Sequence, residues 1–461
     1  MDSSKNDRDS VTSPQLAARL DVFDATLIVM GGIVGSGIFI NPYVVALQVH
    51  TPALILGAWS IGGIVALVGA FIYAELAARL PRAGGQYAYL REAYHPAVAF
   101  LYGWVLLLVI QTGGMAAVAV TFAKYLQTLV RVPISDAWIA TFVLLGLAIV
   151  NCLGVRAGST VQGTLMVLKI LAIAGLVFAG AWIARPATSA SLWHPVLDRP
   201  VSFDLFTAIG AALTPVLFAF GGWQTANFIA PEVRETRRNL PRALVLGVLG
   251  VIVLYLAVNY IYLRVLGPAS LAATATPATE VMRRALGESG TRLIAIGITI
   301  STLGFLSQSI LTAPRVYFAM AKDGLFFRSV AWLDPRHNVP VVAILLQAAA
   351  AVVIALSGRY EQILNYVVSM DFIFFGLTAT CLFVFRRRER GAGGVSVVSG
   401  GGSFFRVPGH PYTTATFIAI SWLVVANTIY RYPGNTLIGL GILLAGVPVY
   451  YLWVRRSKLS R

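Results

Sequence analysis

Long apolar stretches recur along the whole chain and are separated by short polar segments. Many stretches approach the ~20 residues that an α-helix needs to cross about 30 Å of hydrocarbon. Their apolar residues are continuous rather than alternating, which favours helices over the strands of a membrane β-barrel. The fold class that we predict is therefore an all-α integral membrane protein. Its twelve predicted spans lie at residues 22–47, 53–78, 97–127, 136–152, 157–184, 205–229, 240–265, 290–320, 340–357, 362–385, 412–430 and 435–454.

Composition and charge agree with lipid as the main solvent. Of the 461 residues, 57% are hydrophobic and 12% are charged, too few charges to cover a water-exposed surface of this size. A net charge of +16 would suggest a nucleic-acid partner in a soluble protein. Most of the 35 lysines and arginines, however, fall in the loops and tails on one side of the predicted spans. This positive-inside pattern predicts a cell-membrane protein with both termini in the cytoplasm and no nucleic-acid partner.

The cysteines, the histidines and the N-terminal segment give no sign of a disulfide, a metal site or a signal peptide. Cys152 and Cys381 lie at or within predicted spans and far apart, and the five histidines fall in loops. We therefore expect no disulfide framework, no metal site and no cofactor. The polar N-terminal segment lacks the apolar region of a signal peptide, so we expect no processing.

Glycines interrupt the first and sixth predicted spans at comparable places. The first contains Gly35, Ser36 and Gly37 midway, and the sixth contains Gly221 and Gly222. Five spans separate the two breaks, and an odd number of spans inverts the second copy of a repeat relative to the first. The sequence therefore predicts an inverted-repeat transporter whose broken helices meet at the middle of the bilayer.

This organisation divides the chain into five parts. They are a cytoplasmic tail at 1–20, a first repeat at 21–187, a second repeat at 205–388, a flexible linker at 389–411 and two further helices with the C-terminal tail at 412–461. The alternative is that small residues four apart, such as Gly31 and Gly35, serve only close helix packing. A second glycine break five spans later favours the repeat.

Several motifs together resemble the amino acid, polyamine and organocation transporter superfamily, and within it the L-amino-acid transporter branch. The resemblance covers residues 20–388 and implies an amino acid transporter with five-plus-five inverted repeats, two extra helices and alternating access. Its motifs are GSGIF at 35–39, YAELAARLPRAGGQYAYLREAYHP at 73–96, FAFGGWQTANFIAPEV at 218–233, RRNLPRAL at 237–244 and LNYVVSMDFIFFGLT at 364–378. Members that bind a heavy chain covalently do so through a cysteine in the loop after the third helix. That loop, 124–136, has none here, so we expect no disulfide-linked partner.

A zwitterionic substrate brings an anion and a cation into a medium that solvates neither. We expect the N–H groups that follow the first break to bind the carboxylate at the positive end of a half-helix. The carbonyls that end the half-helix before the second break would then accept from the ammonium. The residues involved are Gly35, Ser36, Gly37 and Ile38 at the first break, and Phe218, Ala219, Phe220 and Gly221 at the second.

Aromatic residues flank this site. In the resembled family, an aromatic at the position of Phe218 closes over the bound substrate; the alternative is that it only packs the bundle or faces lipid. For Trp223 both interpretations stay open. Tyr255 and Asn259, one turn apart, either face the site or serve as interhelical hydrogen-bonding groups.

Lys169 is the basic residue that we place inside a span. The resemblance implies that it takes the place of the cation that sodium-coupled relatives hold between the first and eighth helices. Its expected partners are carbonyls at 32–35 and the hydroxyls of Ser309 and Thr312; the alternative is a lysine that extends to the interface. We then expect no sodium coupling, whereas exchange, uniport and proton symport stay open.

Two carboxylates complete the candidates. Asp371, well inside a span, is either a structural hydrogen-bond acceptor or a proton carrier, and Glu75 is a structural or gating residue paired with Arg79 or Arg82. The resulting hypothesis is a sodium-independent exchanger of neutral L-amino acids, whose partners are its substrate and the lipid bilayer. A proton-coupled symporter is the alternative. A membrane-embedded transferase would need His, Asp or Glu side chains converging at one membrane face, which the pattern does not offer.

Overall fold

The computed structural model describes residues 16, 18–130, 132–186, 195–357, 360–391, 405–431 and 433–459. Most of the predicted N-terminal tail and residues 392–404 of the predicted linker lie outside the described residues. Within the described ranges the chain is helical, and its only extended pairing is an isolated parallel bridge between Leu20 and Val233. The all-helical prediction is thus confirmed.

The helices follow one another closely along the chain. In order they are α1 (Val22–Ile33), α2 (Gly37–Ala46), α3 (Pro52–Arg79), α4 (Gln86–Ala93), α5 (Pro96–Val105), the π-helical η1 (Leu106–Ile110), α6 (Gln111–Leu129), α7 (Asp136–Cys152), α8 (Val155–Phe178), the π-helical η2 (Ala179–Ile183), α9 (Phe203–Phe220), the 3₁₀-helical η3 (Trp223–Glu232), α10 (Thr236–Leu271), α11 (Pro277–Thr312), α12 (Pro314–Lys322), the 3₁₀-helical η4 (Arg328–Ala331), α13 (Val341–Ser357), α14 (Tyr360–Gly391), α15 (Tyr412–Arg431) and α16 (Pro433–Leu459).

Nine described helical stretches are long and apolar enough to cross a membrane, and the bent pair of α1 and α2 makes a tenth. The shorter apolar helices α7 and α13 coincide with two further predicted spans. Two predicted span ends, at 265 and 290, fall close to kinks at Gly267 and Gly287, where φ is +73° and +62°. The helices α10 and α11 therefore continue past the predicted ends of their spans, which apolar periodicity alone did not show.

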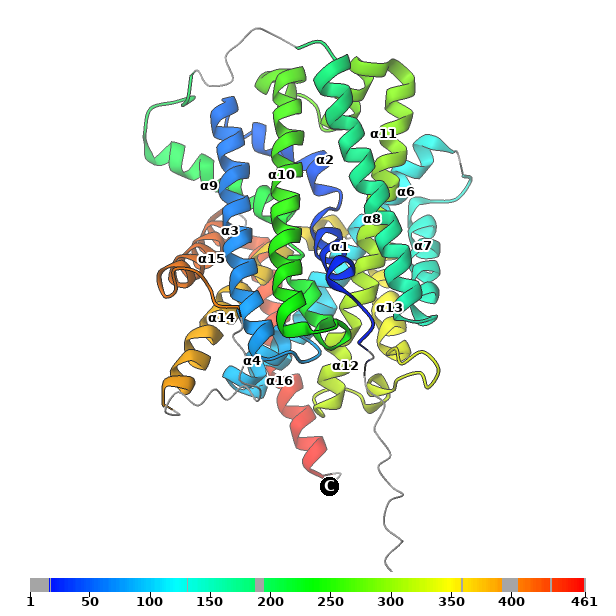
Figure 1. Ribbon diagram of the computed structural model, residues 1–461, viewed down its shortest axis with the longest axis vertical. Helices are drawn as coiled ribbons and strands as arrows, with labels where there is room; N and C mark the ends of the chain where they lie inside the picture. Colours follow the sequence, from blue (N-terminus) through cyan, green and yellow to red (C-terminus); the bar gives the residue numbers. More distant parts are fainter. Residues whose placement is uncertain are drawn as a thin grey trace, which may run out of the picture.

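The helices α1 and α10 lie at the centre of the bundle, with α3 on one side and α8 and α11 on the other (Figure 1). The helices α15 and α16 pack beside α14. We call the face that carries residues 18–21, α4 and α12 the terminal face; it is at the bottom of Figure 1. The opposite face carries the end of α2 and residues 195–202.

Local sequence sets the start of α1. The Asp21 side chain accepts from Asp24 N–H, and the Asp24 side chain accepts from Asp21 N–H, which forms a capping box. The helix begins directly after Leu20, whose carbonyl accepts from Arg234 N–H at 2.8 Å. The entry to α1 is thereby joined to the exit of η3 at the terminal face.

Candidate functional site

The first break separates α1 from α2 at residues 34–36, and the two helices are bent by 42°. Val34 is extended, with φ −76° and ψ 96°, so it cannot continue the helix. In the first turn of α2, Phe39 N–H donates to Ser36 O at 3.1 Å. No hydrogen-bond partner is found among the described residues for the amides of Gly37 and Ile38. These two N–H groups are the free donors that the first turn of a helix provides.

The second break follows α9, which ends at Phe220. Gly221 is extended, and Gly222 adopts the left-handed region with φ +105°. Gly221 N–H donates to Phe218 O at 3.0 Å, and the Tyr255 hydroxyl donates to Ala219 O at 3.3 Å. The expectation that all three carbonyls before this break are free was therefore wrong for two of them. Within the described chain, only the carbonyl of Phe220 among the three lacks a donor.

The two breaks touch each other. A Cβ on Gly222 would lie 2.0 Å from Gly32 O, and a Cβ on Gly32 would lie 2.6 Å from Gly222 O. Both positions therefore need glycine for close backbone approach. Thr225 Oγ1 donates to Gly222 O at 2.6 Å and accepts from Gln308 Nε2 at 2.6 Å, which ties the second break to α11.

A cavity of about 260 Å³ lies between the breaks. Residues of α2, α6, α9, α11 and α14 line it, together with Gln224 and Thr225 of η3. The sequence candidates that line it are Gly35, Ser36, Gly37, Phe218, Ala219, Gly221, Ser309 and Asp371. The candidates Ile38, Phe220, Trp223, Tyr255, Lys169 and Thr312 are placed behind this lining.

The aromatic candidates separate into two kinds. Phe218 is 38% exposed and lines the cavity, in the place that a gating side chain would need. Trp223 is 3% exposed, stacks on Phe375 with ring centroids 5.5 Å apart and meets Tyr73 edge to face at 4.8 Å. The ring of Trp223 thus packs the bundle, which favours the packing interpretation; its assignment as a substrate-binding residue stays a prediction.

Tyr255 connects the two breaks instead of lining the cavity. Its buried hydroxyl reaches Ile33 O at 3.1 Å and Ala219 O at 3.3 Å. These contacts favour a positioning role for Tyr255, and its assignment to direct substrate contact stays a prediction. Asn259 Nδ2 donates to Tyr255 O at 2.8 Å in the same helix and makes no contact with the cavity lining that the structure describes.

Lys169 is fully buried, so it does not extend to the interface. Its Nζ donates to Val34 O, a carbonyl within the expected range 32–35. The expected hydroxyl partners were wrong. Thr312 Oγ1 donates to Gln308 O at 3.0 Å, and among the described residues Ser309 Oγ has no hydrogen-bond partner. The α11 hydroxyl at the first break belongs to Ser301, which donates to Gly35 O at 3.1 Å.

The two candidate carboxylates differ in their surroundings. Glu75 is fully buried and paired with Arg79 at 2.8 Å and with Arg386 at 2.6 Å, so the predicted pairing with Arg79 is confirmed. Asp371 is partly exposed and lines the cavity, and no donor to its carboxylate is found in the described part of the chain. The structure therefore gives no support to the interpretation of Asp371 as a structural hydrogen-bond acceptor. Nor do three His, Cys, Asp or Glu side chains gather anywhere in the described ranges where they would hold a metal ion.

Sequence reasoning missed several polar residues of the cavity, above all Gln111 on α6 and Gln308 on α11. Both lie inside predicted apolar spans, where a polar side chain is costly, and this signal would have found them. Gln111 also follows the π-helical segment Leu106–Ile110, and π-helical turns often accompany functional sites.

A buried ion pair and a backbone bridge connect elements near the terminal face. Arg315 and Glu232 form an ion pair at 2.7 Å with both side chains 1% exposed, which links α12 to η3. The Leu20–Val233 bridge lies beside it.

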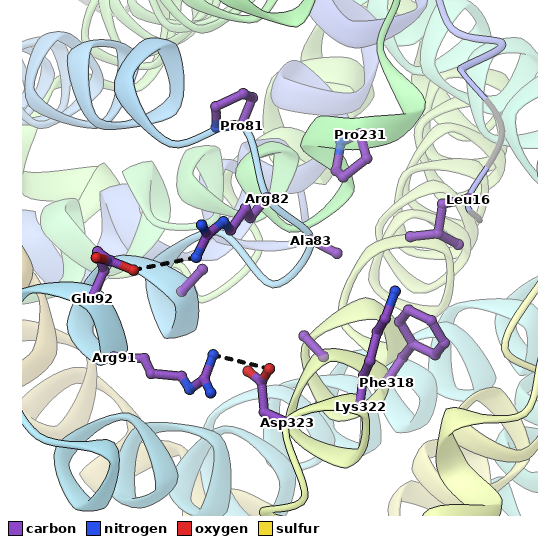
Figure 2. Close-up of a pocket in the computed structure, with 12 residues that line it drawn as sticks. Leu16, Pro81, Arg82, Ala83, Arg91, Glu92, Pro231, Phe318, Lys322 and Asp323 are labelled. Carbon is purple, nitrogen blue, oxygen red and sulfur yellow. Dashed lines mark hydrogen bonds and ion pairs between the residues drawn. The ribbon is translucent and has the colours of Figure 1, made fainter. Parts of the chain in front are cut away.

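A second cavity, of about 400 Å³, opens near the terminal face between α4, η3 and α12. Figure 2 shows Arg91 and Asp323 pointing toward each other across it, 2.9 Å apart, with Arg82 and Glu92 paired at 3.2 Å on the α4 side. Tyr87 also donates to Asp323, at 3.0 Å. Burial raises the pKa of Asp323, and the neighbouring Arg91 acts in the opposite direction. These contacts join α4 to α12 on the exit side of η3.

Comparison with known proteins agrees with this geometry. The family model described as amino acid permease matches residues 20–451. The chain is 28% identical over 452 residues to the serine/threonine exchanger SteT of Bacillus subtilis, covering 96% of this chain and 98% of that protein. It is 28% identical over 461 residues to the human large neutral amino acids transporter small subunit 2, covering 96% of this chain and 82% of that protein. It is also 28% identical over 376 residues to the human b(0,+)-type amino acid transporter 1, covering 80% of this chain and 76% of that protein. The chain therefore belongs to the amino acid permease family, as a multi-pass membrane transporter of amino acids and not an enzyme.

Proposed function

We propose that this transporter exchanges neutral L-amino acids across the cell membrane without sodium, by alternating access. The observation that carries the proposal is the meeting of two helix breaks at one cavity. The first break offers the unpartnered amides of Gly37 and Ile38 for a carboxylate. The second offers the carbonyl of Phe220, and the remaining lone pairs of Phe218 and Ala219, for an ammonium. Recognition of the α-carboxylate and the α-ammonium of the substrate then needs no charged side chain.

Sodium independence is supported by Lys169. Its ammonium already donates to Val34 O at the first break, and it packs so tightly on α11 that a Cβ on Gly304 would lie 2.9 Å from Lys169 Cε. A sodium ion at the same carbonyl would meet a like charge within contact distance.

Exchange of neutral substrates is supported by the walls and by the relatives. Apolar side chains, among them Ile40, Val118 and Leu217, surround the space beyond the α-groups. The names of SteT and of the human large neutral amino acids transporter describe an exchanger and a carrier of neutral amino acids. We further propose that 21–187 and 205–388 are inverted repeats and that the terminal face lies in the cytoplasm.

The test uses purified protein in liposomes. Vesicles loaded with one neutral amino acid should take up radiolabelled neutral amino acids faster than empty vesicles do, and uptake should be unchanged when choline replaces sodium. Uptake into empty vesicles that is driven by a pH gradient would favour the proton-coupled alternative. Failure of every amino acid of the panel to enter would refute the proposal.

A further inference from the structure

The central cavity contains one unbalanced charge. Asp371 is the charged side chain among its described lining residues, and its carboxylate has no hydrogen-bond or ion-pair partner there. Lys169, the buried cation at the first break, directs its Nζ to Val34 O and is outside the cavity lining.

The charged side chains on the elements packed against α14 do not balance Asp371 either. None of them lines the cavity, and they lie near helix ends or on the short helix α4. Those whose side chains the structure describes are Lys124 on α6, Glu75 and Arg79 on α3, Arg91 and Glu92 on α4, and Arg455 on α16.

Charge balance then constrains the loaded state. In the proposed function, the substrate carboxylate and ammonium are balanced by the two helix breaks, so they leave Asp371 uncompensated. A carboxylate enclosed without a partner is strongly unfavourable away from water. The occupied cavity therefore needs one more positive charge: a proton on the Asp371 carboxylate supplies it when the substrate is neutral, and a substrate with a cationic side chain supplies it directly.

The surroundings of Asp371 suit an organic cation. Gln111 on the facing helix α6 lines the same cavity, is 7% exposed and has no hydrogen-bond partner among the described residues, so its amide oxygen is available as an acceptor. The rings of Phe372 and Phe375 also line the cavity, and aromatic faces attract cations. Val367 and Val368 add apolar wall for the stem of a long side chain.

We infer that Asp371 and Gln111 form a side-chain subsite for a cationic group, so that the transporter accepts basic amino acids such as arginine and lysine as well as neutral ones. The inference rests on the proposed function, because it takes the α-groups to be held at the breaks. The carboxylate receives the charge-assisted hydrogen bonds, and the Gln111 carbonyl accepts a further N–H.

The test compares arginine with citrulline, which replaces the guanidinium by a neutral group of similar shape. Competition against uptake of a radiolabelled neutral amino acid is measured in proteoliposomes for the wild type, Asp371→Asn, Asp371→Glu and Thr121→Ala. Thr121 lines the same cavity, but its hydroxyl is already bonded to Ala117 O, so it serves as the matched control. Size-exclusion profiles establish that each variant is folded.

In the wild type, arginine should compete at concentrations roughly tenfold or more below citrulline. Asp371→Asn should make arginine and citrulline equal competitors, measured against the neutral uptake that this variant retains, whereas Asp371→Glu and the control should keep the preference for arginine. Equal competition by arginine and citrulline in the wild type overturns the subsite while neutral exchange leaves the proposed function standing. The subsite is also overturned if neutral uptake requires both a proton gradient and Asp371 while arginine does not compete. Absence of any exchange by the wild type refutes the proposed function instead.

Discussion

Gly222 is the position where the geometry of the two breaks is most sensitive to a single methyl group. Its φ of +105° is one that a residue with a Cβ rarely adopts, and such strain costs about 1–3 kcal/mol. The added Cβ in Gly222→Ala would also lie 2.0 Å from Gly32 O. Carbon and oxygen atoms approach to roughly 3.3 Å, so the breaks would have to separate by about 1.3 Å. A displacement of ~1 Å in a site typically reduces its rate about 100-fold.

We therefore expect Gly222→Ala to reduce exchange in proteoliposomes about 100-fold and to lower the midpoint of thermal unfolding. Gly175→Ala is the matched control, because Gly175 lies inside α8 and a Cβ there meets no atom within 4 Å. That control should keep wild-type exchange and gain up to ~1 kcal/mol from helix propensity. Near-normal exchange by Gly222→Ala would show that transport does not need the two breaks in contact.

Three further predictions follow from the same geometry. Lys169→Met should leave Val34 O without its donor, cost about 1–3 kcal/mol in thermal unfolding and slow exchange in both sodium and choline; unaltered kinetics would contradict the role of this ammonium. Amino acid esters and decarboxylated amines should not compete for uptake, and strong competition by an ester would refute the carboxylate site. Burial raises the pKa of Asp198, but hydrogen bonds from Arg199 and from His50 N–H outweigh this and hold the pKa below its usual range. Stability from this group is present above the ordinary aspartate value and lost as pH falls through the lowered pKa, so Asp198→Asn should reduce the acid sensitivity of unfolding; equal sensitivity would contradict it.

The positions of helices and breaks were readable from the sequence because each has a local cause. Apolar runs set the spans, and the glycines around residues 35 and 221 mark the two places where helical dihedrals end. The burial of Lys169 was likewise predictable, since apolar residues lie on both sides of it. These features depend on a residue and its chain neighbours.

The contacts between helices were not readable in the same way. Ser301 and Ser309 lie on one helix, eight residues apart, which is about 12 Å along the axis. Which of them meets the first break depends on how far α11 is shifted along its axis relative to α1, and packing along the whole helix sets that shift. Trp223 shows the same limit, because the left-handed dihedrals of Gly222 end the periodicity of α9 before Trp223 and so change the direction of its ring.

The contacts of the first break show how a non-helical segment is stabilised inside the bundle. Its three successive carbonyls each accept from a different helix: Ile33 O from Tyr255 on α10, Val34 O from Lys169 on α8 and Gly35 O from Ser301 on α11. The acceptors of the break are thus satisfied by the protein, whereas its amide donors at the start of α2 are left for an anion. Because three helices hold these carbonyls, the first break is anchored to α8, α10 and α11 at the same time.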